Sequence, residues 1–257
     1  MMSHRGQAAH RLSLIHHHLI GGESLTVTYE RHEATSHFLT KHNTASTAAN
    51  IYVRIGSVSV PLSTPTNNTL VPVGYLFPTN DQALTTAQQL AGLSKQQDVL
   101  STLQFIMKKQ ILKQDIFLIG PPGPTRRRIA MAYCELMQRE VEHLCVSPDV
   151  TESDIKQRRE IKNKTAIYEN AAAVRAALLG RILIIDGIEK AERNVLPVIN
   201  NLLENREMAL EDGRFIVAPQ RYEELLALHG EQQLAHWNLI KAHPAFFVIA
   251  IGLPVPK

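Results

Sequence analysis

The 257-residue sequence has no long apolar run and little cysteine. Its longest apolar candidate, residues 245–253, stops before Pro254 and is far shorter than the ~20 residues that a membrane-spanning helix needs. We therefore expect no transmembrane segment. The two cysteines, Cys134 and Cys145, have no metal-ligand spacing, which excludes a disulfide framework and favours a reducing compartment. Both lie in apolar patterns, which predict buried thiols.

A strong charge of one sign is also absent. Lys and Arg together number 27 against 24 Asp and Glu. A nucleic-acid-binding protein is expected to carry a basic stripe along one face, whereas the basic clusters at 126–128 and 158–159 are short. We expect no nucleic-acid partner, and RNA binding through the basic N-terminal tail ranks last among the functions considered.

Acidic residues are missing from the first 22 positions, which contain Arg5, Arg11 and several histidines. An arginine-bearing, acid-poor start is typical of a mitochondrial transit peptide, and a disordered tail is the alternative. We assign residues 1–45 to such a presequence or disordered segment, although Glu30 and Glu33 weaken a presequence of that full length.

Residues 46–93 form the next predicted unit. Residues 51–62 alternate apolar and polar side chains and predict two short strands that turn near Gly56. Residues 63–92 are rich in proline and asparagine, which indicates irregular chain. A helix is expected over about residues 94–109, with one apolar face made by Val99, Leu100, Leu103, Ile106 and Met107.

From residue 115 onward, apolar strands alternate with helices, a pattern typical of a parallel α/β sheet with helices on both faces. Residues 94–257 are therefore predicted to form a three-layer α/β domain. Strands are expected at 116–119, 143–146, 182–185 and 246–251. Helices are expected around 129–137, over 166–179 and from Pro197, and polar helices are expected around 221–241. A hairpin is expected to turn at residues 211–213.

The first of these strands runs into the sequence Gly120-Pro121-Pro122-Gly123-Pro124-Thr125-Arg126-Arg127. A P-loop has the pattern GxxxxGK[ST] between a strand and a helix, where backbone N–H groups and the lysine hold phosphates and the hydroxyl binds Mg²⁺. The context and Gly120 match this pattern. Thr125, Arg126 and Arg127 replace the second glycine, the lysine and the hydroxyl residue. We take these eight residues as the candidate nucleotide-binding loop; a simple Gly/Pro turn is the alternative.

A second apolar strand ends about 60 residues later in Asp186. P-loop NTPases place an aspartate at this point to support Mg²⁺, so Asp186 is the candidate metal ligand. An aspartate here is also often just a helix cap. Related ATPases have a glutamate next to it that activates water, but this chain has Gly187. The sequence therefore assigns no catalytic residue.

Residues 117–256 resemble the AAA+ ATPases of the dynein-related, MoxR-like group. The resemblance rests on the loop above and on the segments 154–160, 180–187, 200–207, 212–214 and 249–254. It implies a P-loop NTPase core, ATP and Mg²⁺ as ligands, and other AAA+ modules or subunits of a ring as partners. Longer strings, and residues 52–72, are similar to one mitochondrial family within the group, whose members carry several AAA+ modules and an adhesion-type metal domain. That similarity implies location in the mitochondrial matrix.

The resemblance also implies that the chain stops at the sensor strand of a first module, before the last sheet strand, the arginine finger and the helical lid. Residues 116–119 would then be an exposed sheet edge next to 246–251. Leu253 stands where the group has a sensor asparagine. The departures at Thr125, Arg126, Arg127, Gly187 and Leu253 leave two functions open: an ATP-hydrolysing module of a ring, and a pseudo-ATPase that acts as an assembly or interaction module. Hydrolysis would need its base from Glu189 or a neighbouring subunit.

Overall fold

The computed structural model describes residues 27–32, 50–75 and 86–254. Its centre is a four-stranded parallel sheet in the order β4-β12-β8-β5. The four strands are β4 (Ile116–Ile119), β12 (Phe247–Gly252), β8 (Ile182–Asp186) and β5 (Val141–Cys145). All four were predicted from the sequence to within two residues. Within the described ranges β4 pairs only with β12, so it is the expected sheet edge.

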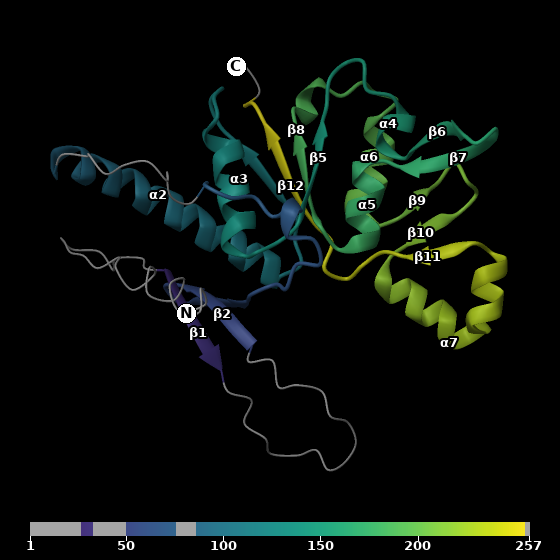
Figure 1. Ribbon diagram of the computed structural model, residues 1–257, viewed down its shortest axis with the longest axis horizontal. Helices are drawn as coiled ribbons and strands as arrows, with labels where there is room; N and C mark the ends of the chain where they lie inside the picture. Colours follow the sequence, from purple (N-terminus) through teal and green to yellow (C-terminus); the bar gives the residue numbers. More distant parts are fainter. Residues whose placement is uncertain (1–26, 33–49, 76–85, 255–257) are drawn as a thin grey trace, which may run out of the picture.

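Helices cover both faces of this sheet, which confirms the three-layer α/β fold (Figure 1). Two long helices lie on one face and two shorter helices lie on the other. On β8, Ile182 and Ile184 pack into the core of the first face, whereas Leu183 and Ile185 pack into the core of the second. A strand buried on both faces needs apolar residues at every position. The first face carries α2 (Thr86–Ile111) and α3 (Thr125–Leu136), and the second carries α5 (Ala172–Leu179) and α6 (Leu196–Glu204).

The N-terminal strands form a separate antiparallel sheet of β1 (Val27–His32), β2 (Asn50–Ile55) and β3 (Val58–Pro61). The predicted turn falls at Gly56, which has a left-handed φ of 57°. Side chains of β2 and β3 share a core with α2 and α3. The strand β1 lies inside residues 1–45, where none was predicted. The stretch 63–92, expected to be irregular, contains the short helix η1 (Asn68–Leu70), and α2 begins within it at Thr86 instead of at about residue 94.

A hairpin replaces the first part of the helix that was predicted over 166–179. Here β6 (Gln157–Lys162) pairs with β7 (Thr165–Asn170), after the short helix α4 (Glu152–Ile155). The two turn residues, Asn163 and Lys164, both have left-handed φ angles, 52° and 63°. Two such residues in succession make the tight turn that suits an antiparallel hairpin. The helix prediction was therefore wrong for 166–170, and α5 begins only at Ala172.

The remaining elements form a small second sheet and its helix. The predicted hairpin is present as β9 (Met208–Ala209) and β10 (Phe215–Val217), after η2 (Ile188–Lys190) and α6. Polar helices were expected around 221–241. The structure has α7 (Pro219–His236), which is broken at Gly230, where φ is 76°. The prediction was wrong for 239–241, where β11 (Leu239–Lys241) adds to β10.

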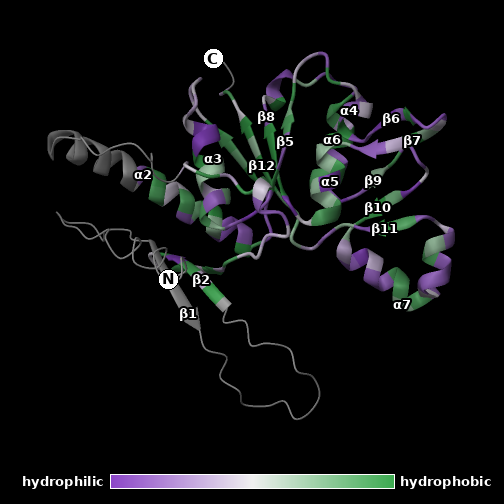
Figure 2. Ribbon diagram, in the orientation of Figure 1, coloured by the Kyte–Doolittle hydropathy of each residue, from purple (hydrophilic) through white to green (hydrophobic). Residues whose placement is uncertain are grey.

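Hydrophobic residues concentrate on the central strands β8 and β12, as Figure 2 shows by their green colour. No helix in the described ranges is both long and apolar enough to cross a membrane. Cys134 is buried on α3, as predicted, but Cys145 is exposed. The prediction of two buried thiols was wrong for Cys145 because this residue is the last of β5, a strand with one neighbour among the described strands.

Candidate functional site

The candidate loop lies at the carboxyl ends of the parallel strands, the edge at which open α/β sheets bind ligands. In Figure 1 the arrowheads of β5, β8 and β12 all point to this edge, at the top of the view. The loop leads from β4 directly into α3, so the strand–loop–helix context of a phosphate site is present. Residues 121–125 are exposed.

Backbone donors in this loop come chiefly from the start of α3. The first N–H groups of a helix have no partner within it and favour an anion, and no side chain caps the first turn of α3. Gly123 has φ of 141°, in a region that favours glycine. The three prolines at 121, 122 and 124 bring no N–H, so the loop offers fewer donors than its length suggests.

Arg126, at the position of the P-loop lysine, is half-buried and spans the site. Its Nη1 donates a hydrogen bond to the carbonyl oxygen of Gly252, at the end of β12. Its Nε is buried and finds no hydrogen-bond partner among the described residues. An unsatisfied buried donor costs ~1–3 kcal/mol, so an acceptor such as a phosphate oxygen would be stabilised beside it. The unpartnered Nε of Arg126 is therefore compatible with a nucleotide phosphate as its acceptor.

Arg127 forms an ion pair with Asp186. Its Nε lies 2.9 Å from Oδ2 of Asp186, and its Nη2 contacts the same oxygen. The hydrogen bond from Arg127 to Asp186, followed by the attraction of the carboxylate charge, raises the pKa of Arg127 above its ordinary value. The structure thus brings together two predicted site residues that are 59 positions apart in the sequence. It places a guanidinium on the predicted metal ligand.

The surroundings of this pair do not resemble a metal centre. On the neighbouring strand β5, Cys145 pairs in register with Asp186, and its Sγ lies 3.8 Å from Nδ1 of His143. Burial lowers the pKa of His143, and the positive charge of Arg127 lowers it further. Nowhere in the described ranges do three His, Cys, Asp or Glu side chains come together to hold a metal ion. With Arg127 paired to the predicted carboxylate ligand and no hydroxyl at position 127, the residues present do not fit Mg²⁺.

The position that would carry the catalytic glutamate suits only glycine. Gly187 has a left-handed φ of 82°, and a Cβ there would come within 3.0 Å of the carbonyl oxygen of Val146. Glu189, the alternative base, lies at the same edge: its Oε2 would be 3.1 Å from a Cβ placed on Gly252. Leu253, in place of the sensor asparagine, is partly exposed and follows β12 directly.

Sequence reasoning missed three contributors to this site: the Gly252 carbonyl, His143 and Cys145. The carbonyl carries no side-chain signal. A usable signal did exist for the β5 residues, because β5 and β8 were both predicted as strands of one parallel sheet and end at the same edge. From that, His143 and Cys145 could have been placed beside Asp186.

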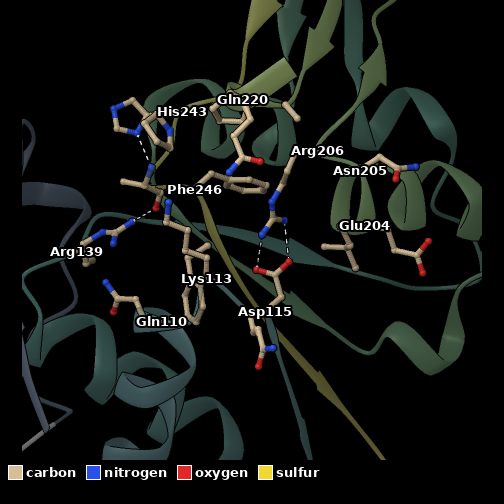
Figure 3. A pocket seen from close by; sticks show the side chains of 17 residues that line it. Gln110, Lys113, Asp115, Arg139, Glu204, Asn205, Arg206, Gln220, His243 and Phe246 are labelled. Carbon is tan, nitrogen blue, oxygen red and sulfur yellow. Dashed lines mark hydrogen bonds and ion pairs between the residues drawn. The ribbon is translucent and has the colours of Figure 1, made fainter. Parts of the chain in front are cut away.

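A large cavity, of about 760 Å³, lies at the opposite end of the sheet (Figure 3). Its lining residues precede β4, β5 and β12, or lie at the end of α6 and the start of α7. Arg206 pairs with Asp115 at 2.7 Å and lies over the ring of Phe246 at 4.9 Å. Arg139 donates hydrogen bonds to the carbonyl oxygens of Gly180 and Ala245. Arg139 joins the segments that enter the central strands, and Arg206 joins the end of α6 to the segments that enter β4 and β12, so we assign both a structural role.

Comparisons with known proteins place the chain in a family. Residues 115–257 match the AAA domain of the dynein-related subfamily. Over 205 residues, the chain is 51% identical to mouse von Willebrand factor A domain-containing protein 8, a match covering 80% of this chain and 10% of the mouse protein. An uncharacterized protein of Staphylococcus saprophyticus is 25% identical over 119 residues, 44% of each chain.

Among solved structures, a Cytophaga hutchinsonii protein named as a proposed ATPase matches with a TM-score of 0.40 and 13% identity, over 67% of this chain and 48% of that one. The family assignment does not rest on it. The chain thus spans about one tenth of the length of the mouse relative and less than half of the length of the other two proteins.

Proposed function

Because this chain belongs to the dynein-related subfamily of AAA domains, we propose that it binds ATP over the loop 120–127 and serves as a non-hydrolysing module of an AAA+ assembly. Its three-layer α/β core is that of an AAA+ P-loop NTPase. The observation that carries the proposal is the pairing of Arg127 with Asp186. It leaves the phosphate-binding helix end in place and occupies the carboxylate that hydrolysis would need.

Two groups of this chain would hold the phosphates. The N–H groups at the start of α3 accept negative charge together with the helix dipole. The guanidinium of Arg126 provides a planar, permanently charged donor set that suits phosphate oxygens. Its unpartnered Nε gives one of these bonds a defined position, next to the end of β12.

The site lacks the side chain that usually activates the attacking water for hydrolysis. With Gly187 in a left-handed conformation, no side chain there holds the attacking water. The departures that the sequence shows at Thr125, Arg127 and Leu253 lie at the same edge of the sheet. These features favour binding without turnover by this chain.

The proposal is tested by calorimetric titration of ATP into the chain. Replacing Arg126 by alanine is expected to weaken ATP binding at least about tenfold, since a charged hydrogen bond contributes ~1.5–3 kcal/mol. The matched control is Arg128→Ala, an exposed neighbour on the same helix, which is expected to bind like the wild type. Equal affinity in the wild type and Arg126→Ala, or no binding by the wild type, would reject the loop as the site.

A hydrolysing module is the second candidate, and the position of Glu189 is the observation in its favour. This carboxylate lies against Gly252, beside the backbone oxygen to which Arg126 is bonded. If Glu189 serves as the base, Glu189→Gln abolishes phosphate release while ATP binding persists. We rank this candidate second because Arg127 already neutralises Asp186.

We further propose that the partners are other AAA+ modules or subunits and that the protein resides in the mitochondrial matrix. The edge strand β4, with Phe117 and Ile119 half-exposed, supports the first proposal. The acid-free, arginine-bearing start of the sequence supports the second. A fluorescent protein fused after residue 50 is expected to enter mitochondria, and Arg5→Glu with Arg11→Glu is expected to leave it in the cytosol. Cytosolic fluorescence of the unmodified fusion would reject the targeting proposal.

A further inference from the structure

Arg127 stands where a P-loop has the hydroxyl that binds Mg²⁺, and its side chain points toward the strand edge. It reaches Asp186, the carboxylate at the end of β8, with Nε 2.9 Å from Oδ2. The side chain of Arg127 is 55% exposed, and that of Asp186 is 22% exposed. The arginine is thus both anchored at the strand edge and open to a ligand over the loop.

The charge arrangement at this point excludes a second cation. The guanidinium keeps its positive charge at any pH that the folded protein survives. Mg²⁺ binds through one or two carboxylates together with phosphate oxygens and water. The carboxylate of Asp186 is already engaged by Arg127, and position 127 supplies no hydroxyl ligand. A divalent ion would have to displace Arg127 and remain next to its charge.

We propose that Arg127 takes over the charge-neutralising role of the divalent cation, so that this site binds the phosphates of ATP without metal. The inference rests on the proposed nucleotide site. Arg126 and Arg127 then flank the bound phosphates, one held by the Gly252 carbonyl and the other by Asp186. The pair with Asp186 uses Nε and Nη2 of Arg127, so the exposed guanidinium can donate from Nη1 to a phosphate oxygen while Asp186 still holds it. Asp186 acts as a positioning residue that keeps the guanidinium over the site.

The test is calorimetric titration of ATP into the full chain, once with EDTA and once with excess MgCl₂. Three variants accompany the wild type: Arg127→Ser, which restores the P-loop hydroxyl; Arg127→Lys, which keeps the charge; and Arg128→Ser, the exposed control. The wild type, Arg127→Lys and Arg128→Ser are expected to bind ATP at least as tightly in EDTA as in MgCl₂. In EDTA, Arg127→Ser is expected to bind ATP at least about tenfold more weakly than the wild type, equivalent to 1.4 kcal/mol. With MgCl₂ it is expected to regain affinity.

Wild-type binding that strengthens about tenfold or more with MgCl₂ would overturn the inference while leaving the nucleotide site intact. So would an Arg127→Ser variant that binds equally well in both buffers. Absence of ATP binding by the wild type in either buffer would overturn the nucleotide site itself, and the inference with it. Thermal unfolding of each variant confirms that it is folded, and the wild-type and Arg127→Lys titrations decide the question even if Arg127→Ser is unstable.

Discussion

Glu140 and Arg181 form a largely buried ion pair, with Nε of Arg181 2.6 Å from Oε2 of Glu140, where the chain enters β5 and β8. The other oxygen of Glu140 accepts hydrogen bonds from Thr66 and Asn67. One carboxylate therefore ties the segment after β3 to the central sheet, and so helps to fix the strands whose far ends carry the site.

Protonation of Glu140 is expected to destabilise the fold. Burial alone would raise the pKa of Glu140, but the hydrogen bonds from Thr66, Asn67 and Arg181 prevail and lower it from 4.5 to about 2. Because the folded-state pKa is the lower one, this stabilisation is complete above about pH 4.5 and is lost as the pH falls toward 2. A shift of this size corresponds to ~3 kcal/mol.

Glu140→Gln should therefore unfold at lower urea concentration at neutral pH, with a loss of ~2–3 kcal/mol and a smaller dependence on acid. Glu223→Gln is the control, because Glu223 pairs with Lys241 on the surface, at 56% exposure, where a change below ~1 kcal/mol is expected. Equal urea midpoints for Glu140→Gln and the wild type at neutral pH would contradict the role assigned to Glu140.

Restoring the family's glutamate at Gly187 is expected to damage the fold without creating hydrolysis. Gly187→Glu places a Cβ on left-handed backbone and within 3.0 Å of the Val146 carbonyl oxygen. Strain of this kind costs ~1–3 kcal/mol. Gly213→Glu is the matched control, since Gly213 has φ of 84° and open space around it. Urea unfolding should show a larger loss for Gly187→Glu than for Gly213→Glu; equal losses would show that the Val146 contact is unimportant.

The edge strand β4 is expected to make the chain self-associate. Ile119 is 57% exposed on a strand that pairs on one side only among the described strands, and such edges associate unless they carry charge or cover. In sedimentation velocity, Ile119→Lys should shift the chain toward monomer. Leu228→Lys, at an equally apolar exposed position on α7, should not. Identical distributions for both variants would exclude β4 as the contact.

The fold could be predicted where burial imposes a pattern on the sequence. The strands β8 and β12 are apolar at nearly every position because both of their faces are buried. The hairpin β6–β7 was missed because its side chains are mostly exposed, so no apolar alternation records it, and Lys164 is an unusual residue for its left-handed turn. The short strand β11 was missed for a similar reason. It follows a polar helix, and no proline marks where that helix ends.

The site could be predicted only as separate pieces. The loop 120–127 and Asp186 each carry a recognisable spacing. Their pairing depends on how β4 and β8 meet at one edge, with β12 between them, and no local pattern contains that. The left-handed backbone of Gly187 and the carbonyl of Gly252 are likewise properties of the folded chain.

The most direct test of the proposed function measures ATP binding and phosphate release on the same samples of the full chain. Wild type and Asp186→Ala are compared, with folding checked by thermal unfolding. We predict that the wild type binds ATP and that its phosphate release does not exceed that of Asp186→Ala, because Arg127 neutralises Asp186 and Gly187 supplies no base. Phosphate release by the wild type that disappears in Asp186→Ala would contradict the account and make this chain a working ATPase.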